Sequence, residues 1–193
     1  RSMVNIHVER IPEIYACCDS LITAEDVASA ARFQNERRRR EHLAWRRIVR
    51  DNLGRKVRIA YNEVGAPVVD RADTYISVAH SHEAVAVAIA DCPVGIDIES
   101  SERDFERAKS RFMTPAEQQL SDDKNWGAYV WTAKEALYKL SGRRGIELLG
   151  DLCIDSYNAT ERRMCCTIAQ RERAVVEISH YARAYIVAVA YYG

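Results

Sequence analysis

The sequence has no apolar run near the roughly 20 residues needed to cross a bilayer, and no apolar segment near its first residues that reads as a secretory signal. It also has no net charge, because 28 Lys and Arg residues balance 28 Asp and Glu residues. With 48% hydrophobic and 29% charged residues, the 193-residue chain has the composition of a soluble globular protein. We therefore expect a cytoplasmic protein with no membrane partner. Overall neutrality also speaks against coating of nucleic acid, for which the whole domain is usually basic.

The cysteines lack the spacing of a metal site, since none forms a Cys-x-x-Cys pair and the histidines show no zinc pattern. Two adjacent pairs also make a poor disulfide framework, so we expect free and mostly buried thiols. The six are Cys17, Cys18, Cys92, Cys153, Cys165 and Cys166.

The pattern of apolar residues and helix caps predicts an α+β fold. There is no low-complexity linker and no repeat of the solenoid kind. Thr23 and Asp26 form a capping-box signal for a helical region that runs to Gly54, with a break near 34–36, and Thr114 with Pro115 marks a later helix start. A second long helix is expected over 125–141. Strands are expected at 4–9, 57–61, 75–79, 84–90, 94–99, 152–157, 164–169, 174–180 and 184–192, and a turn at 62–67. This order predicts two α+β lobes, residues 1–93 and 94–193, with antiparallel sheets.

A pair of carboxylates lies on the strand expected at 94–99. Residues two apart on a strand face the same side, so Asp97 and Glu99 point together, away from the core. Two such carboxylates repel unless a cation lies between them, and hard oxygen ligands suit Mg²⁺. Gly95 would leave room for a ligand beside the strand. The alternative is a strand end that runs into solvent, with both acids hydrated.

The second long helix carries Trp131, Glu135 and Lys139 at i, i+4 and i+8, on a face apart from its apolar stripe. Glu135 and Lys139 alone could be a surface ion pair. A large aromatic side chain on the same polar face indicates that something covers it.

Two further groups suit a phosphate ligand. His80 and Ser81 lie between two expected strands and can donate hydrogen bonds to phosphate, although a solvated turn or a serine hydrolase would also fit them. Eleven Arg or Lys residues and three acidic ones lie between Arg32 and Arg58. Such a basic helix suits a polyanionic ligand or an acidic partner protein, because guanidinium groups bind phosphate through two hydrogen bonds. The alternative is a solvated basic face.

Taken in order, these groups resemble the 4'-phosphopantetheinyl transferases, in particular the longer, surfactin-synthetase-activating type. The resemblance covers roughly residues 33–190. It is carried by Gly95-Ile96-Asp97-Ile98-Glu99 and by Trp131, Lys134, Glu135, Ala136 and Lys139.

The resemblance implies transfer of phosphopantetheine from coenzyme A to a serine of an apo acyl or peptidyl carrier protein, which leaves adenosine 3',5'-bisphosphate. It also implies two similar α+β lobes related by a pseudo-twofold axis, with the active site between them, in a monomer. A metal-dependent nuclease and a non-catalytic carrier-binding module are the rival hypotheses.

The resemblance further implies roles for single residues. Asp97, Glu99 and Glu135 would bind Mg²⁺, and Glu135 would take the proton of the carrier serine. Lys139, with help from Lys134, would hold the pyrophosphate. The corner of His80 and Ser81 would contact a phosphate of coenzyme A. The basic helix would contact the 3'-phosphate, with Arg37, Arg40 and Arg46 as candidates. Many relatives have Lys at the position of Ala66 and Ser at that of Ala79, so weaker binding of coenzyme A is expected.

Overall fold

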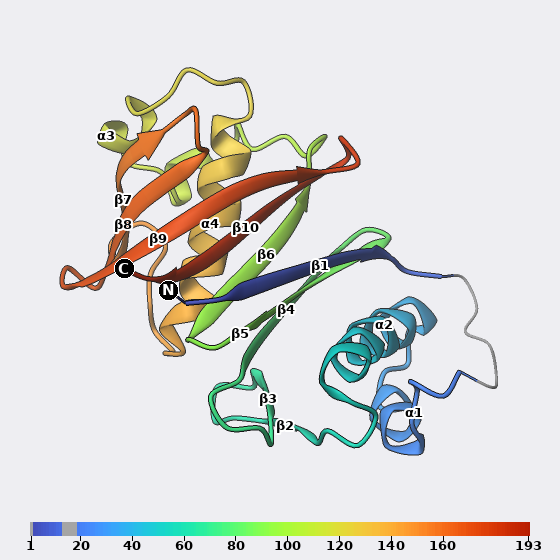
Figure 1. The fold of residues 1–193 in the computed structure, drawn as a ribbon. Coiled ribbons are helices and arrows are strands. Elements are labelled where there is room, and N and C mark those ends of the chain that lie inside the picture. The colour runs from blue at the N-terminus through green and yellow to red at the C-terminus, as the bar shows by residue number, and fades with distance from the viewer. Residues whose placement is uncertain (1, 13–18) are drawn as a thin grey trace.

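The computed structural model describes residues 2–12 and 19–193. The first half of the chain forms a three-stranded antiparallel sheet of order β1-β5-β4, with helix α2 against it and α1 and a small β2–β3 hairpin beside that helix (Figure 1). The elements are β1 (Val4–Arg10), α1 (Ala24–Ala30), α2 (Glu36–Leu53), β2 (Ile59–Tyr61), β3 (Pro67–Val69), β4 (Tyr75–Ser81) and β5 (Ala84–Ala90).

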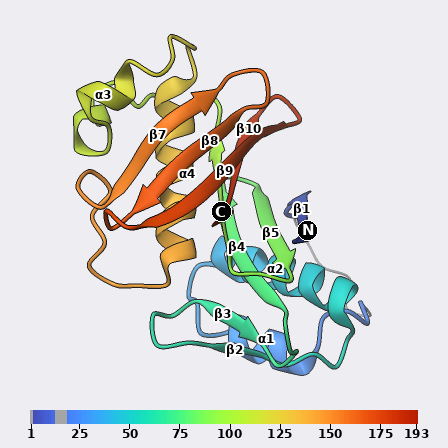
Figure 2. The same cartoon turned by 60° about the vertical axis from the view of Figure 1, so that its left-hand side comes forward.

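The second half forms a five-stranded antiparallel sheet of order β6-β10-β9-β8-β7, with α4 along one face (Figure 2). Its elements are β6 (Val94–Ser100), the 3-10 turn η1 (Lys109–Arg111), α3 (Pro115–Gln118), α4 (Trp126–Ser141), β7 (Leu152–Asn158), β8 (Arg163–Ile168), β9 (Glu172–Tyr181) and β10 (Tyr185–Tyr192). The predicted α+β class is thereby confirmed. In both sheets the first strand pairs with the last, but the pseudo-twofold axis and a boundary at residue 93 stay predictions.

Helix caps account for where the helices begin and end. Thr23 forms a capping box with Asp26 at the start of α1, and Asn35 caps α2, so the predicted break between the two helices is confirmed. Thr114 forms a second capping box, and Gly142 ends α4 with a left-handed backbone, φ 60°. The short strand β3, at the end of the predicted turn, was not foreseen.

The alternating sequence of β5 explains how the layers stack. Its alanines, such as Ala86, face Ile96 of β6 and Val187 of β10, and small side chains let the two sheets approach closely. Its larger residues, such as Val87, face the opposite way and pack on Ile48 of α2. The order of layers is therefore α2, the three-stranded sheet, the five-stranded sheet and α4.

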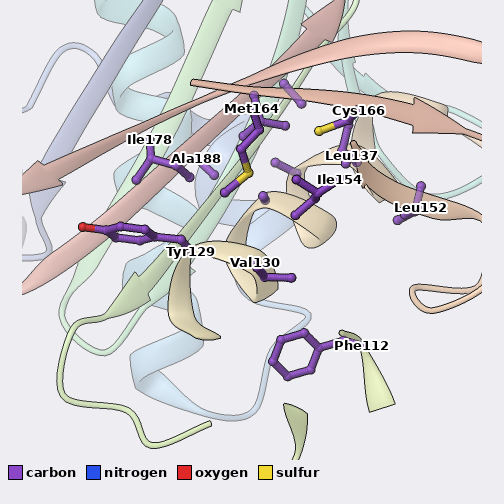
Figure 3. Packing of buried hydrophobic residues seen from close by; sticks show 14 of the residues in the cluster. Phe112, Tyr129, Val130, Leu137, Leu152, Ile154, Met164, Cys166, Ile178 and Ala188 are labelled. Atoms are coloured by element: carbon purple, nitrogen blue, oxygen red, sulfur yellow. The ribbon is translucent and has the colours of Figure 1, made fainter. Parts of the chain in front are cut away.

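The largest core lies between α4 and the five-stranded sheet, where Val130 and Leu137 pack among Ile154, Met164 and Ala188 (Figure 3). The apolar stripe predicted on this helix is buried as expected. No described helix is long and apolar enough to cross a membrane.

The prediction for the cysteines needs correction. The four described cysteines are free, but only Cys166 is buried; Cys153 and Cys165 are exposed because they lie on the outer face of β7 and β8. Cys17 and Cys18 lie outside the described residues.

Candidate functional site

Gly95 brings α4 directly onto β6. A Cβ atom at this position would lie 2.1 Å from the carbonyl oxygen of Ala136 and 2.6 Å from the amide nitrogen of Leu140. Any other residue would push the helix away from the strand. The space that was predicted for a ligand is therefore filled by the helix backbone, and the glycine serves close packing.

The polar faces of β6 and α4 meet because strand and helix run in opposite directions. Gly95 lies beside Ala136, while Glu99, four residues later, accepts a hydrogen bond from Trp131 Nε1 at 3.3 Å. Asp97, between them, lies with Oδ1 3.4 Å from Lys139 Nζ. The acid pair and the helix face thus form one cluster, which we call the carboxylate cluster: Asp97, Glu99 and Glu135, with Lys139.

Lys139 also joins the two halves of the protein. Its ammonium donates to the carbonyl oxygen of Val78 on β4 at 3.1 Å and to that of Ile96 on β6 at 2.9 Å. With Asp97 as the third acceptor, all three N–H donors of the ammonium have a partner. Beside it, Ser77 Oγ accepts from the Ile96 amide at 3.0 Å, so β4 and β6 are linked at two points.

Burial and mutual repulsion raise the proton affinity of these acids. Burial raises the pKa of Asp97 to about 7; Lys139 opposes this rise, while the charges of Glu135 and Glu99 add to it. Burial also raises the pKa of Glu135, again against Lys139 and with help from Glu99. The cluster therefore carries negative charge that one lysine does not fully offset.

Glu99 has a cation of its own. Arg103 Nη1 lies 2.5 Å from Glu99 Oε1, and its guanidinium stacks over the rings of Phe105 at 4.7 Å and Trp131 at 5.3 Å. Phe112 contacts Trp131 edge-on, with ring centroids 5.3 Å apart. The segment 103–112 therefore covers Trp131, which explains the aromatic residue on a polar helix face.

The described residues contain no group of three or more His, Cys, Asp or Glu side chains placed to hold a metal ion. The predicted ligands Asp97, Glu99 and Glu135 lie within one electrostatic cluster, but Glu99 is oriented toward Arg103.

A cleft of about 970 Å³ opens between the two halves, and Asp97 and Lys139 form part of its wall. The first half contributes residues of α2, the β2–β3 hairpin and β4, and the second half contributes the end of α4 with the residues that follow it. The lining includes Arg32, Phe33, Arg38, Glu41, His42, Trp45, Tyr61, Ala66, Ala79, His80, Tyr138, Arg143 and Arg144.

The two residues of the His80–Ser81 corner lie differently with respect to the cleft, and their contacts to phosphate stay a prediction. His80 lines the cleft with 57% of its side chain exposed, and its Nδ1 lies 3.2 Å from Oε2 of the buried Glu41 on α2. Ser81 ends β4 and does not line the cleft, within the described chain. Arg37 Nε lies 3.5 Å from the other carboxylate oxygen of Glu41, Oε1, and Arg37 Nη2 donates a hydrogen bond to the His82 carbonyl.

Arg46 is buried and ion-paired within the first half of the protein, and its contact to a phosphate stays a prediction. It is 2% exposed and donates to Asp26 Oδ1 at 3.1 Å, while Arg50 donates to both oxygens of the same carboxylate at 2.6 and 2.8 Å. The two arginines tie α2 to α1. The cleft wall, as the described residues form it, includes none of the three predicted arginines Arg37, Arg40 and Arg46.

Lys134 is likewise committed to the core. Its side chain is fully buried, and its ammonium donates to Glu117 Oε1 and to the Leu148 carbonyl, both at 2.9 Å. Glu117 Oε2 accepts in turn from the Ile154 amide at 2.8 Å. Lys134 therefore anchors α4 to α3 and β7 and cannot reach a ligand in the cleft without breaking this network.

Sequence reasoning missed the α2 residues that do line the cleft. Arg38, His42 and Trp45 follow each other at i, i+4 and i+7, a spacing that places them on one helix face. That spacing was a readable signal, but a run of four arginines hid which of them shares this face. Arg38 stacks over the Phe33 ring at 4.7 Å.

The family model of the 4'-phosphopantetheinyl transferase superfamily matches residues 93–190, about half of the chain, from the start of β6 into β10. No curated protein matches the chain. The matched segment contains the whole carboxylate cluster, so the residues that sequence analysis selected for chemistry lie where the family model finds its pattern. The chain belongs to the 4'-phosphopantetheinyl transferase superfamily.

Proposed function

We propose that the protein transfers the 4'-phosphopantetheine group of coenzyme A to a serine of an apo carrier protein. One observation carries this proposal: the carboxylate cluster opens through Asp97 and Lys139 into a cleft of about 970 Å³ that has arginines on both walls. Pockets for small ligands measure roughly 300–1,000 Å³, so an elongated nucleotide fits this size. The carrier class, a monomeric state, a cytoplasmic location and the longer family type stay predictions.

The proposed reaction needs a base and a cation at the reacting phosphate. The serine oxygen attacks the pyrophosphate phosphorus that bears the pantetheine arm, and the bond from that phosphorus to the bridging oxygen breaks. Glu135 is the proposed base, because its raised pKa makes it a better proton acceptor than an ordinary carboxylate. Lys139, on the cleft wall, would stabilise the charge that grows on the departing adenosine 3',5'-bisphosphate.

Mg²⁺ fits the chemistry of the cluster. Three carboxylates supply the hard oxygen ligands that this ion prefers. Burial first, and the charges of Glu135 and Glu99 second, raise the pKa of Asp97, and a bound cation would favour the ionised carboxylate against both. Asp97 and Glu135 are the stronger candidates to hold the ion, since Arg103 already neutralises Glu99. When bound, Mg²⁺ would act as a Lewis acid on the pyrophosphate oxygens.

The test is a transfer assay with coenzyme A, Mg²⁺ and a panel of apo carriers, read as a mass gain on the carrier. Asp97→Asn and Glu135→Gln should each lower the rate by about 10²- to 10⁴-fold. Glu161→Gln, in an exposed turn between β7 and β8, is the control and should transfer normally.

Each negative result has a meaning of its own. Folded protein that binds coenzyme A but modifies no carrier would favour the binding-module hypothesis. Cleavage of plasmid DNA that Glu99→Gln abolishes would favour the nuclease.

A further inference from the structure

The cations of the cleft differ in whether they already have strong partners. On the wall formed by the second half, Lys139 has three acceptors and Arg143 forms an ion pair with Glu172. Arg144 differs from both. Its Nη2 donates a hydrogen bond to the backbone carbonyl of Glu63 at 2.6 Å, and no carboxylate of the described chain pairs with it.

This hydrogen bond crosses from one half of the protein to the other. Arg144 is exposed and lies in the segment Gly142–Gly145, where both glycines have positive φ, 60° and 77°. Glu63 lies in the turn of the β2–β3 hairpin, which Asn62 Oδ1 holds by accepting from the amides of Val64 and Ala66. The hairpin and the end of α4 both line the cleft, so the contact spans one of its edges.

The contact is weaker than the one that a phosphate would offer. A backbone carbonyl is neutral and takes one N–H of the guanidinium, whereas a phosphate is charged and takes two in a fork. The donor is charged in both contacts, but only the phosphate adds a charged acceptor and a second parallel hydrogen bond. A phosphate in the cleft would therefore draw Arg144 away from Glu63.

We propose that Arg144 binds a phosphate group of coenzyme A from the wall opposite α2, exchanging the Glu63 carbonyl for the ligand. This inference rests on the proposed function. The ligand would then meet a guanidinium group from each half: Arg38 from α2 and Arg144 from the segment after α4. The ligand is thereby held between the two halves, with its pyrophosphate beside Lys139.

The test is titration calorimetry of coenzyme A, 3'-dephospho-coenzyme A and adenosine 3',5'-bisphosphate. Arg144→Gln should weaken coenzyme A binding about 10- to 100-fold, the usual range for losing a hydrogen bond to a charged group. Arg144→Lys, which keeps the charge but not the fork, should lose less. The matched control is Arg173→Gln on β9, which is exposed and outside the cleft wall; it should bind as the unmodified protein does.

The three ligands assign the phosphate. If Arg144→Gln weakens all of them alike, Arg144 binds a phosphate that they share. If dephospho-coenzyme A is unaffected, it binds the 3'-phosphate. A purely structural role would instead lower the ligand-free melting temperature and leave the affinities unchanged.

Two outcomes overturn the inference, and they differ. If the unmodified protein binds and transfers, and Arg144→Gln binds coenzyme A equally well, Arg144 is no ligand and the proposed function stands. If the unmodified protein does not bind coenzyme A at all, the proposed function fails and the inference fails with it.

Discussion

His42 should make the protein less stable in mild acid. The side chain lies on α2 with 6% exposure, its Nε2 is 2.8 Å from Ser29 Oγ, and its ring packs against Phe33 and Trp45 at centroid distances of 5.2 and 5.3 Å. Burial, together with the charges of Arg46 and Arg32 and against the opposing charge of Asp26, lowers the pKa of His42 to about 4. The folded protein therefore keeps this imidazole neutral at pH values at which an exposed histidine takes up a proton.

The sign and size of the effect follow from proton binding. Between pH 6.5 and about 4 the unfolded chain binds a proton at His42 and the folded chain does not, so the free energy of unfolding decreases as the pH falls. The stabilisation is complete above pH 6.5. A difference of about 2.5 pKa units, at about 1.36 kcal/mol per unit, corresponds to a loss of about 3 kcal/mol at the acid end.

Urea unfolding of the unmodified protein and of His42→Gln, from pH 4.5 to 7.5, tests this. Other groups titrate in this range, and Asp97 with its raised pKa acts in the opposite direction, but their contributions cancel in the difference between the two proteins. That difference should move in favour of the variant as the pH falls, by about 2.5 kcal/mol between pH 7.5 and 4.5, since the full loss is reached only below the folded pKa. The control is His82→Asn in the exposed β4–β5 turn, where Asn tolerates the positive φ of 48°. A difference that stays constant with pH would refute the account of His42.

Three further predictions concern packing, a buried ion pair and the cleft. Gly95→Ala should destabilise the protein by about 1–3 kcal/mol or more and lower transfer, because its Cβ meets the α4 backbone. Gly127→Ala should be tolerated in the same urea titration, because its Cβ would lie 3.5 Å from the Cβ of Phe105, and equal tolerance of both variants would disprove the close packing. Lys134→Met should lower the free energy of unfolding by about 3–5 kcal/mol, because it leaves Glu117 buried without its cation. Adding Glu117→Gln to this variant should restore part of the loss. A double variant no more stable than Lys134→Met alone would argue against the ion pair. Ala66→Lys should increase the affinity for coenzyme A in calorimetry, because it adds a positive charge to the cleft wall. An unchanged affinity would mean that the phosphates of coenzyme A do not bind near Ala66.

Local signals in the sequence predicted the elements well because caps and periodicity act over a few residues. The capping box of Thr114 and Glu117 is one example. Which charged residue faces the cleft depends instead on partners far along the chain. Lys134 is adjacent to Glu135 in the motif, yet one residue turns about 100° around a helix, and that rotation directs its ammonium to Glu117.

Arginine gave the least reliable sequence signal. Arg46 looked like a ligand residue because it lies in a basic helix, but Asp26, 20 residues earlier, pairs with it inside the protein. Nothing in the composition of α2 separates Arg46 from Arg38, which lines the cleft. The spacing of Arg38 with His42 and Trp45 does not separate them either, because Arg46 has His42 one turn before it and Val49 one turn after it. What distinguishes Arg46 is its ion pair with Asp26, a partner that only the fold brings to it.

Lys139 contributes to the packing of the two halves as well as to the cleft, so a substitution at this residue would change both stability and activity. Its ammonium satisfies carbonyl oxygens of both halves, Val78 and Ile96, as well as the carboxylate of Asp97. Removing it would leave two part-buried carbonyls without a donor and Asp97 without its cation, so stability and chemistry would fall together. The contact to Asp97, at 3.4 Å, is the longest of the three and therefore the one that a phosphate can replace while the halves stay joined. One side chain can thus hold the two halves together and still turn one of its donors toward the substrate.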